Sequence, residues 1–344
     1  MNGQHYNHHN VIHRDSGQIL RFTVPTLPYT KRMVSTLKIA LVPGGSRGLG
    51  LLVSRKLLDR GYAVAIAARD HHELTRATEQ LSPHGTVKDY VCDVRDADAV
   101  KQLVREVEQD MGPVEVLITV AGIIQAGPLE AITVEHFKDA IDTMTYGPIY
   151  CALAVLPGMR QRRSGRIGTV TSVGGLISPP HLLPYATAKF GAVGFSEGLA
   201  VALAGSGVSA TTIAPGLMRT GSHERAFFTG QSAKEYAWFA PAASLPVLSM
   251  NAERAARIIV EGVLAGKPSV LVGWLPKVAQ RVHGLAPGLT TRAMGLANRL
   301  LPGARPEQSG TQEGREAASD LNSKVVKVLT TLGSKAARKN NERG

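Results

Sequence analysis

Three residues in the stretch "TSVGGLISPPHLLPYATAK" have the types and the spacing of a proton-transfer site: Ser172, Tyr185 and Lys189. Tyr185 and Lys189 are four positions apart, so on a helix they would lie on one face, one turn apart. A phenol has a pKa of about 10, and a neighbouring ammonium group favours the phenolate and lowers that pKa. Tyr185 would then serve as a general acid or base, as carbonyl reduction or alcohol oxidation requires. Ser172 would hydrogen-bond the substrate oxygen.

A Tyr-x-x-x-Lys pair alone is common on helix surfaces, so this hypothesis depends on a second motif. The stretch "ALVPGGSRGLG" at residues 40–50 joins an apolar run to glycines at positions 44, 48 and 50. Such glycines permit a tight turn and let a phosphate approach the N–H groups of a helix N-terminus. The fingerprint G-x-G-x-x-G would need glycine or alanine at position 53, where Val53 stands. A structural turn would explain one or two of the three glycines, so phosphate binding is favoured.

The elements that must position these motifs alternate along the chain from residue 37 onward. Apolar runs typical of strands lie at 37–42, 63–67, 87–92, 114–120, 165–171, 208–213 and 269–272. Segments with helical periodicity lie at 49–60, 71–81, 96–111, 133–159, 183–205 and 251–265. Strands that are apolar on both faces, separated by crossover helices, predict an α/β fold: a doubly wound, parallel, seven-stranded Rossmann-type sheet with helices on both faces. Ligands of such sheets bind beyond the carboxyl ends of the strands.

Together, these motifs resemble the short-chain dehydrogenase/reductase family, whose glycine loop reads T-G-x-x-x-G-x-G. The resemblance runs from about Leu37 to about Val272, within a domain that we expect at 37–273. It implies an oxidoreductase with Ser172, Tyr185 and Lys189 as catalytic residues. In that family, a basic residue inside the glycine loop and another after the second strand accompany NADP(H). Arg47 and Arg69 occupy these places, and guanidinium groups bind a 2′-phosphate through charge-assisted hydrogen bonds. The alternative is two ordinary surface arginines.

The resemblance also implies roles for other residues along the cofactor. Asp93 would bond the adenine ring, although it could instead cap the next helix, for which Asp96 is better placed. Thr220 in "APGLMRT" would bond the nicotinamide carboxamide, unless this stretch is an ordinary Pro-Gly turn. The complete expected cofactor site is Gly44, Ser46, Arg47, Gly48, Leu49, Gly50, Arg69, Asp93, Val94, Ala121, Gly122, Tyr185, Lys189, Pro215, Gly216 and Thr220.

Three departures from the family pattern leave two functions open. Pro43 replaces the threonine of the glycine loop, and Val120 stands in a motif that usually reads N-N-A-G, which we interpret as a joint repacking of two strand ends. Met144 replaces an asparagine that supports a water chain to the catalytic lysine, for which a carbonyl oxygen, Thr143 or Thr145 could substitute. The favoured hypothesis is an active NADP(H)-dependent enzyme, and the alternative is an NADP(H)-binding sensor or scaffold with little turnover.

The composition of the chain limits the kinds of binding partner and the cellular setting that we expect. The formal net charge is +12, but the basic residues are scattered along the chain. No aromatic residues are interleaved with them, as a surface that stacks on bases would require, so a solvated basic face is favoured over nucleic-acid binding. Cys92 and Cys151 show no metal-ligand or redox spacing, and we expect no metal site and a reduced, cytoplasmic setting. The sequence contains no run of about 18 apolar residues, so it predicts no membrane span.

The remaining segments give weaker expectations. Residues 1–36 are predicted to be a disordered leader, and residues 304–344 a polar, largely mobile tail with one short helix in "LNSKVVKVLTTL". The stretch 217–250 is rich in aromatic residues, which either close a lid over a lipophilic ketone or alcohol or pack on the core. The amphipathic helices expected at 274–303 could contact a membrane surface through 274–301, but a cleft cover or subunit interface is favoured. The family resemblance implies a homodimer or homotetramer.

Overall fold

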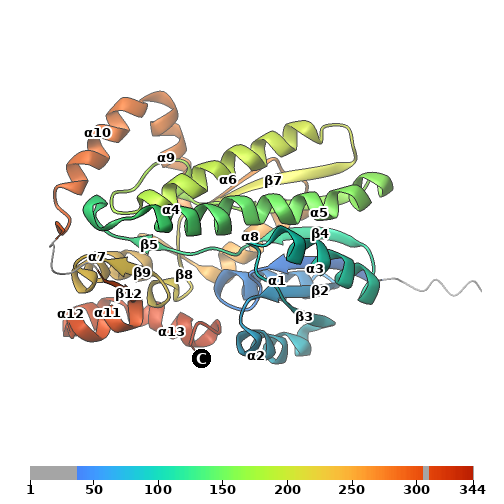
Figure 1. Ribbon diagram of the computed structural model, residues 1–344, viewed down its shortest axis with the longest axis horizontal. Helices are drawn as coiled ribbons and strands as arrows, with labels where there is room; N and C mark the ends of the chain where they lie inside the picture. The colour runs from blue at the N-terminus through green and yellow to red at the C-terminus, as the bar shows by residue number, and fades with distance from the viewer. Residues whose placement is uncertain (1–36, 305–309, 344) are drawn as a thin grey trace, which may run out of the picture. The chain divides into compact units, whose positions relative to one another are not determined.

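The predicted strands form one seven-stranded sheet in which every strand is parallel, in the order β11-β7-β6-β4-β1-β2-β3. The computed structural model describes residues 37–304 and 310–343 (Figure 1). The direction of the strand order reverses between β1 and β4, which is where doubly wound sheets bind their ligands. The strands are β1 Lys38–Pro43, β2 Tyr62–Ala68, β3 Val87–Val91, β4 Val114–Thr119, β6 Gly165–Val170, β7 Val208–Pro215 and β11 Ser269–Val272.

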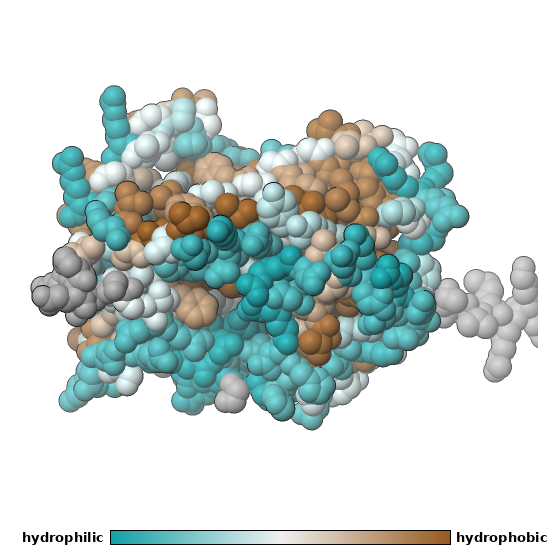
Figure 2. Space-filling model, in the orientation of Figure 1, coloured by the Kyte–Doolittle hydropathy of each residue, from teal (hydrophilic) through white to brown (hydrophobic). Residues whose placement is uncertain are grey.

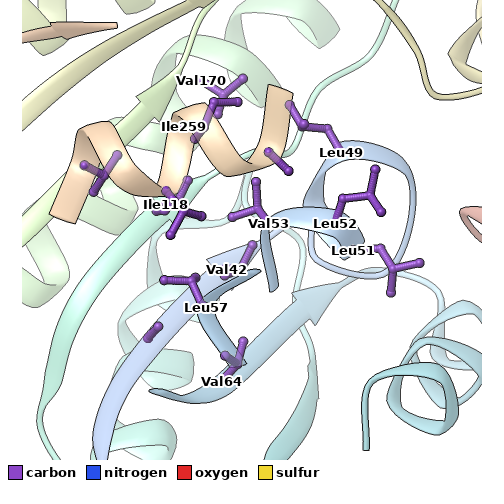
Figure 3. Close-up of a cluster of buried hydrophobic side chains, with 14 of the residues drawn as sticks. Val42, Leu49, Leu51, Leu52, Val53, Leu57, Val64, Ile118, Val170 and Ile259 are labelled. Carbon is purple, nitrogen blue, oxygen red and sulfur yellow. The ribbon is translucent and has the colours of Figure 1, made fainter. Parts of the chain in front are cut away.

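Helices cover both faces of this sheet, which explains why its strands are apolar on both sides. One face packs against α1, α2 and α8 in a core that includes Val42, Leu52 and Ile259 (Figure 3). The other packs against α3, α5 and α6. The helices are α1 Gly48–Leu58, α2 His71–Leu81, α3 Ala97–Asp110, α4 Val134–Ile141, α5 Gly147–Arg162, α6 Leu183–Ala202, α7 Ser232–Ser244, α8 Ala252–Leu264, α9 Trp274–Leu285 and α10 Pro287–Asn298.

The predicted fold class is confirmed, and most predicted boundaries agree with the structure to within three residues. The helix expected at 133–159 differs, because a π-helical turn at Asp142–Tyr146 separates α4 from α5. Such turns insert an extra residue into a helix and are frequent at functional sites. Here the turn carries the buried Met144.

A smaller lobe stands beside the sheet and contains most of the aromatic stretch. Its strands β5 Gln125–Ala126, β9 Phe227–Thr229 and β12 Thr311–Glu313 form a sheet, while β8 Leu217–Arg219 pairs with β10 Ser249–Asn251. Phe228 packs edge-on against both Tyr236 and Phe239 in a separate apolar cluster. For these three side chains, the sequence analysis allowed either a lid over the substrate or packing on the core. The structure supports packing.

The helices expected at 274–303 are α9 and α10, and they keep apolar side chains on the surface. Leu285 on α9 is 88% exposed, and Leu289 on α10 is 66% exposed. Within residues 37–304 and 310–343, no helix is long and apolar enough to span a membrane.

The C-terminal segment differs from its compositional expectation. Residues 310–343 form β12, α11 Gly314–Leu321, α12 Lys324–Leu329 and α13 Thr331–Lys339, and α11, α12 and α13 pack on α7. The short helix expected in "LNSKVVKVLTTL" is α12. Ala317 and Ala337 are completely buried, so small residues give this polar segment close contacts that its composition does not reveal. The leader expected at 1–36 lies outside the described residues.

Candidate active site

A cleft of about 670 Å³ opens at the carboxyl ends of β1, β2, β4, β6 and β7. Its lining includes each of the residues expected for catalysis and for cofactor binding, from the glycine loop to Thr220. The parallel topology explains this gathering, because the carboxyl ends of parallel strands meet at one edge of a sheet. The structure thus brings together residues that are up to 176 positions apart, from Gly44 to Thr220 (220 − 44 = 176).

Ser172, Tyr185 and Lys189 lie together at one end of the cleft, which we call the catalytic end. Ser172 follows β6, and its Oγ accepts a hydrogen bond of 3.0 Å from the Gly174 N–H. Tyr185 and Lys189 share one face of α6, and the Lys189 Nζ is 5.8 Å from the centre of the Tyr185 ring. Lys189 is buried, and its Nζ donates a 2.9 Å hydrogen bond to the Val170 carbonyl.

The proton affinities at this end differ from the simple expectation of a lowered tyrosine pKa. Burial raises the pKa of Tyr185, and a hydrogen bond with Ser172 offsets only part of that rise. Burial also lowers the pKa of Lys189 to about 8, since an ammonium group loses hydration there. Desolvation by burial is therefore the largest cause of the pKa shift of both residues.

The glycine loop turns where the sequence analysis placed it, at the end of β1. Gly44 has a φ of +83° and Gly48 a φ of +56°, which favour glycine. A Cβ on Gly44 would collide with the backbone of Ala121, so the two strand ends approach closely there. The Pro43 carbonyl accepts hydrogen bonds from the Val120 N–H at 2.9 Å and the Ala121 N–H at 3.1 Å. Main-chain bonds therefore join the strand ends at which Pro43 and Val120 depart from the family pattern.

Met144 lies beside the catalytic end in a small apolar cluster with Ala188 and Tyr185. The two threonines beside it differ. The Thr145 hydroxyl donates a 2.8 Å hydrogen bond to the Ala188 carbonyl, whereas Thr143 lines the cleft. Of the two, Thr143 is the better placed to contact water in the cleft.

The other end of the cleft, which we call the phosphate end, is strongly charged. The Arg47 Nη1 lies 2.7 Å from a Glu342 oxygen, and its Nε lies 3.3 Å from Glu73. These carboxylates raise the pKa of Arg47, although burial works in the opposite direction. Arg69 also lines this end of the cleft.

Asp93 lines the cleft, but its carboxylate is bound to Arg95 at 2.7 Å. Arg95 holds the pKa of Asp93 below its ordinary value, although burial acts to raise it. Asp96 caps α3 by accepting the N–H groups of Asp98 and Ala99. The two aspartates thus have separate places, and helix capping belongs to Asp96, as its position predicts.

Sequence reasoning missed several residues of the cleft. Ile123 and Ile124 form an apolar part of its lining, together with Phe227 from the aromatic stretch 217–250, for which a lid over the substrate is one of the two expectations. The first two directly follow Gly122, so their place after β4 could have identified them. Glu73 and Glu342 give no comparable signal, because their roles depend on long-range contacts. Across residues 37–304 and 310–343, no cluster of three or more His, Cys, Asp or Glu side chains could hold a metal ion.

Comparisons with known proteins agree with this geometry. The family model for short chain dehydrogenases matches residues 38–228. An acetoacetyl-CoA reductase from Paracoccus denitrificans is 35% identical over 184 residues, covering 53% of this chain and 74% of that protein. A 3-oxoacyl-(acyl-carrier-protein) reductase from Vibrio harveyi is 34% identical over 184 residues, with the same coverage of 53% and 74%. An actinorhodin polyketide ketoreductase variant crystallised with NADPH is 27% identical, with a TM-score of 0.62, covering 69% of this chain and 95% of that one.

Proposed function

Because the chain belongs to the short-chain dehydrogenase family of oxidoreductases, we propose that it is an NADP(H)-dependent enzyme acting on a carbonyl or alcohol group of a small lipophilic substrate. One observation carries this proposal: Ser172, Tyr185 and Lys189 share a cleft with a glycine loop and two arginines. The cleft therefore combines a proton-transfer site with a site for a phosphate-bearing cofactor.

The residues of the cleft fit such a cofactor. The glycine loop has no side chains at Gly44, Gly48 and Gly50 and leads into the N-terminus of α1, where backbone N–H groups attract anions. Arg47 and Arg69 would bind the 2′-phosphate, and Thr220 would bind the nicotinamide end. Support for NADP(H) comes from these two arginines and from the ketoreductase structure that contains NADPH. When bound, the cofactor supplies or accepts the hydride.

The chain's own residues then handle the oxygen and the proton. In the reducing direction, the Ser172 hydroxyl donates a hydrogen bond to the carbonyl oxygen and stabilises the negative charge that develops on it. The Tyr185 hydroxyl gives its proton to that oxygen, which completes the alcohol and leaves a phenolate. The Lys189 ammonium, 5.8 Å from the Tyr185 ring centre, stabilises the phenolate. The oxidising direction reverses each transfer.

The apolar lining favours a lipophilic substrate. Ile123, Ile124 and Phe227 present apolar surface to the cleft, and Phe227 is 38% exposed. The named relatives are reductases of acetoacetyl-CoA and of 3-oxoacyl carrier proteins, which adds support for a ketone. We therefore place a ketone or the corresponding secondary alcohol at the catalytic end.

The test is NADPH oxidation by the purified full chain with a panel of apolar ketones, aldehydes and quinones. We expect turnover of at least one ketone. Tyr185→Phe should lower kcat by about 10²- to 10⁴-fold, the usual contribution of a positioned proton donor. Saturable NADPH binding without turnover of any compound would contradict the enzyme hypothesis.

A second candidate is a cofactor-binding sensor or scaffold with little turnover. The observation that favours it is Met144, which buries a thioether where the family usually has an asparagine. Under this hypothesis the cleft binds NADP(H), but the proton relay to Lys189 is impaired. The panel of ketones, aldehydes and quinones distinguishes the two candidates.

We extend the proposal to assembly and location. Figure 2 shows apolar side chains on the face over α4 to α6. Leu153 on α5 and Phe190 on α6 are large apolar residues that are exposed. This surface supports a homodimer or homotetramer, whose mass light scattering would measure.

Cys92 and Cys151 are free and buried, which supports a reducing cytoplasmic setting. Contact of α9 and α10 with a membrane remains a weaker proposal, and flotation with anionic liposomes, with and without residues 274–301, would test it.

A further inference from the structure

The last described residues of the chain, 340–343, pack against the glycine loop, and Glu342 is part of the cleft lining. Asn340, Asn341 and Glu342 are each less than 5% exposed. Figure 1 shows the C-terminal end of the chain between α13 and α2. A polar chain end that is this deeply buried must have its charges and amides satisfied by partners.

The partners are the glycine loop and α2. The Gly48 N–H donates a 2.8 Å hydrogen bond to the Asn340 carbonyl. The Asn341 side chain donates to the carbonyls of Ser46 at 2.8 Å and Glu73 at 2.9 Å, and accepts from Arg76 at 3.0 Å. The segment therefore uses the same backbone that the proposed function assigns to cofactor phosphates.

Glu342 brings a negative charge to this place. One carboxylate oxygen accepts a 2.7 Å hydrogen bond from Arg47. The other would lie 2.5 Å from a Cβ at Gly48, so it sits directly against the first residue of α1. A helix N-terminus and an arginine are the two features that attract phosphates. In this structure both face a carboxylate.

The segment is held in position by the C-terminal lobe, by which we mean α11, α12 and α13 together with α7, on which they pack. Arg315 donates a 2.7 Å hydrogen bond to the Glu342 carbonyl, and Arg343 forms an ion pair with Glu224. A Cβ on Gly221 would collide with Ala337, so α13 packs directly on the turn that follows Thr220. The segment is thus anchored by a folded lobe.

We propose that residues 340–343 are an autoinhibitory plug: they occupy the phosphate end of the cleft, where Glu342 stands in for a cofactor phosphate. Docking of the segment and binding of NADP(H) exclude each other. The inference rests on the proposed function, because it requires a phosphate-bearing cofactor at this end.

The docked carboxylate is suited to replacement. Burial raises the pKa of Glu342, although the charge of Arg47 acts to lower it. The free energy that the ionised carboxylate loses on leaving water is therefore larger than the free energy that it gains from Arg47. A phosphate carries more charge and more acceptor oxygens than a carboxylate, and it matches the arginine fork in two-point contact. The apparent dissociation constant of the cofactor is then its intrinsic value divided by the undocked fraction.

The experiment compares four forms of the otherwise full chain: wild type, a deletion of residues 340–344, Glu342→Gln and Glu316→Gln. Glu316 is exposed on α11 and is not among the cleft residues, so its substitution makes the same charge change outside the cleft. NADPH and NADH are titrated into each form by calorimetry. If about 90% of wild-type molecules are docked, the deletion should bind both cofactors about tenfold more tightly. Glu342→Gln should fall between the deletion and wild type, and Glu316→Gln should match wild type.

A second readout uses wild type alone and so does not depend on how the variants fold. Hydrogen exchange of peptides covering residues 331–343 should be slow without cofactor and clearly faster at saturating NADPH. Cofactor affinity that is indifferent to both the deletion and Glu342→Gln, or a segment that stays protected at saturating NADPH, would overturn the plug while leaving the proposed function intact. Failure of every form, the deletion included, to bind either cofactor would contradict both.

Discussion

The two ends of the cleft are built from the sequence in different ways. At the catalytic end, Ser172, Tyr185 and Lys189 come from one continuous stretch of 18 residues (189 − 172 + 1 = 18). At the phosphate end, Arg47 meets Glu342 across 295 positions of the chain. The first end is set by a strand, a turn and a helix that follow one another, and the second by a lobe that folds back on the sheet.

The difference extends to the forces involved. Main-chain groups fix the side chains of the catalytic end. The Ser172 hydroxyl oxygen accepts a hydrogen bond from the Gly174 N–H, and the Lys189 ammonium donates one to the Val170 carbonyl. At the phosphate end, side chains pair with one another: Arg47 pairs with Glu73 and with Glu342. Under the proposed plug, the Arg47 guanidinium exchanges the Glu342 carboxylate for a cofactor phosphate. We infer that the two ends have separate tasks. The catalytic end keeps the proton-transfer residues in a fixed geometry, and the phosphate end controls cofactor binding through ion pairs that can be exchanged.

Removing the Ser172 hydroxyl tests that separation with the largest expected effect. Ser172→Ala should lower kcat by about 10²- to 10³-fold, as loss of one donor to a reacting oxygen does. The dissociation constant for NADPH should stay unchanged, because Ser172 lies at the catalytic end. Steady-state kinetics and NADPH titration measure the two quantities, and Ser209→Ala, on β7 and not among the cleft residues, is the matched control. A parallel loss of NADPH affinity would show that the two ends are coupled.

The sequence predicted the catalytic end and the sheet because both depend on local pattern. Apolar runs such as β2 and the four-residue spacing of Tyr185 and Lys189 follow from the periods of strands and helices. The π-helical turn around Met144 could not be predicted, since one extra residue leaves the helical pattern of 133–159 almost unchanged. Nor could the place of Glu342, because composition says nothing of a contact between residues 295 positions apart.

Arg69 offers the next largest effect, on the phosphate end alone. A hydrogen bond to a charged group contributes about 1.5–3 kcal/mol, so Arg69→Ala should weaken NADPH binding by about 10- to 100-fold. Binding of NADH, which has no 2′-phosphate, should change little, and kcat at saturating NADPH should be kept. Calorimetry with both cofactors measures the ratio. Arg60→Ala removes a surface arginine paired with Glu261 and should leave both affinities unchanged; equal losses of NADPH and NADH affinity in Arg69→Ala would refute the assignment.

Titration of Lys189 gives an effect of intermediate size at the catalytic end. Burial lowers the pKa of Lys189 from 10.5 to about 8, so the ammonium that stabilises the phenolate is lost as the pH rises through about 8. The kcat for ketone reduction should fall about tenfold per pH unit above that value. Stability should move in the opposite direction, because the cost of burying the ammonium disappears between pH 8 and 10.5. A kcat that is constant from pH 6 to 10 would show that the charge of Lys189 is not needed.

The smallest expected effect comes from Met144, where the chain departs from its family beside the catalytic end. If Thr143, which lines the cleft, contacts the relay water in place of the usual asparagine, Met144→Asn should leave kcat within about threefold of wild type. Met144→Leu, which keeps an apolar side chain of similar volume, is the control, and Thr143→Val should then lower kcat. Stopped-flow measurement of NADPH oxidation separates this step from product release. A rise of about 100-fold in Met144→Asn would instead mean that the natural relay is impaired, and it would favour the sensor over the enzyme.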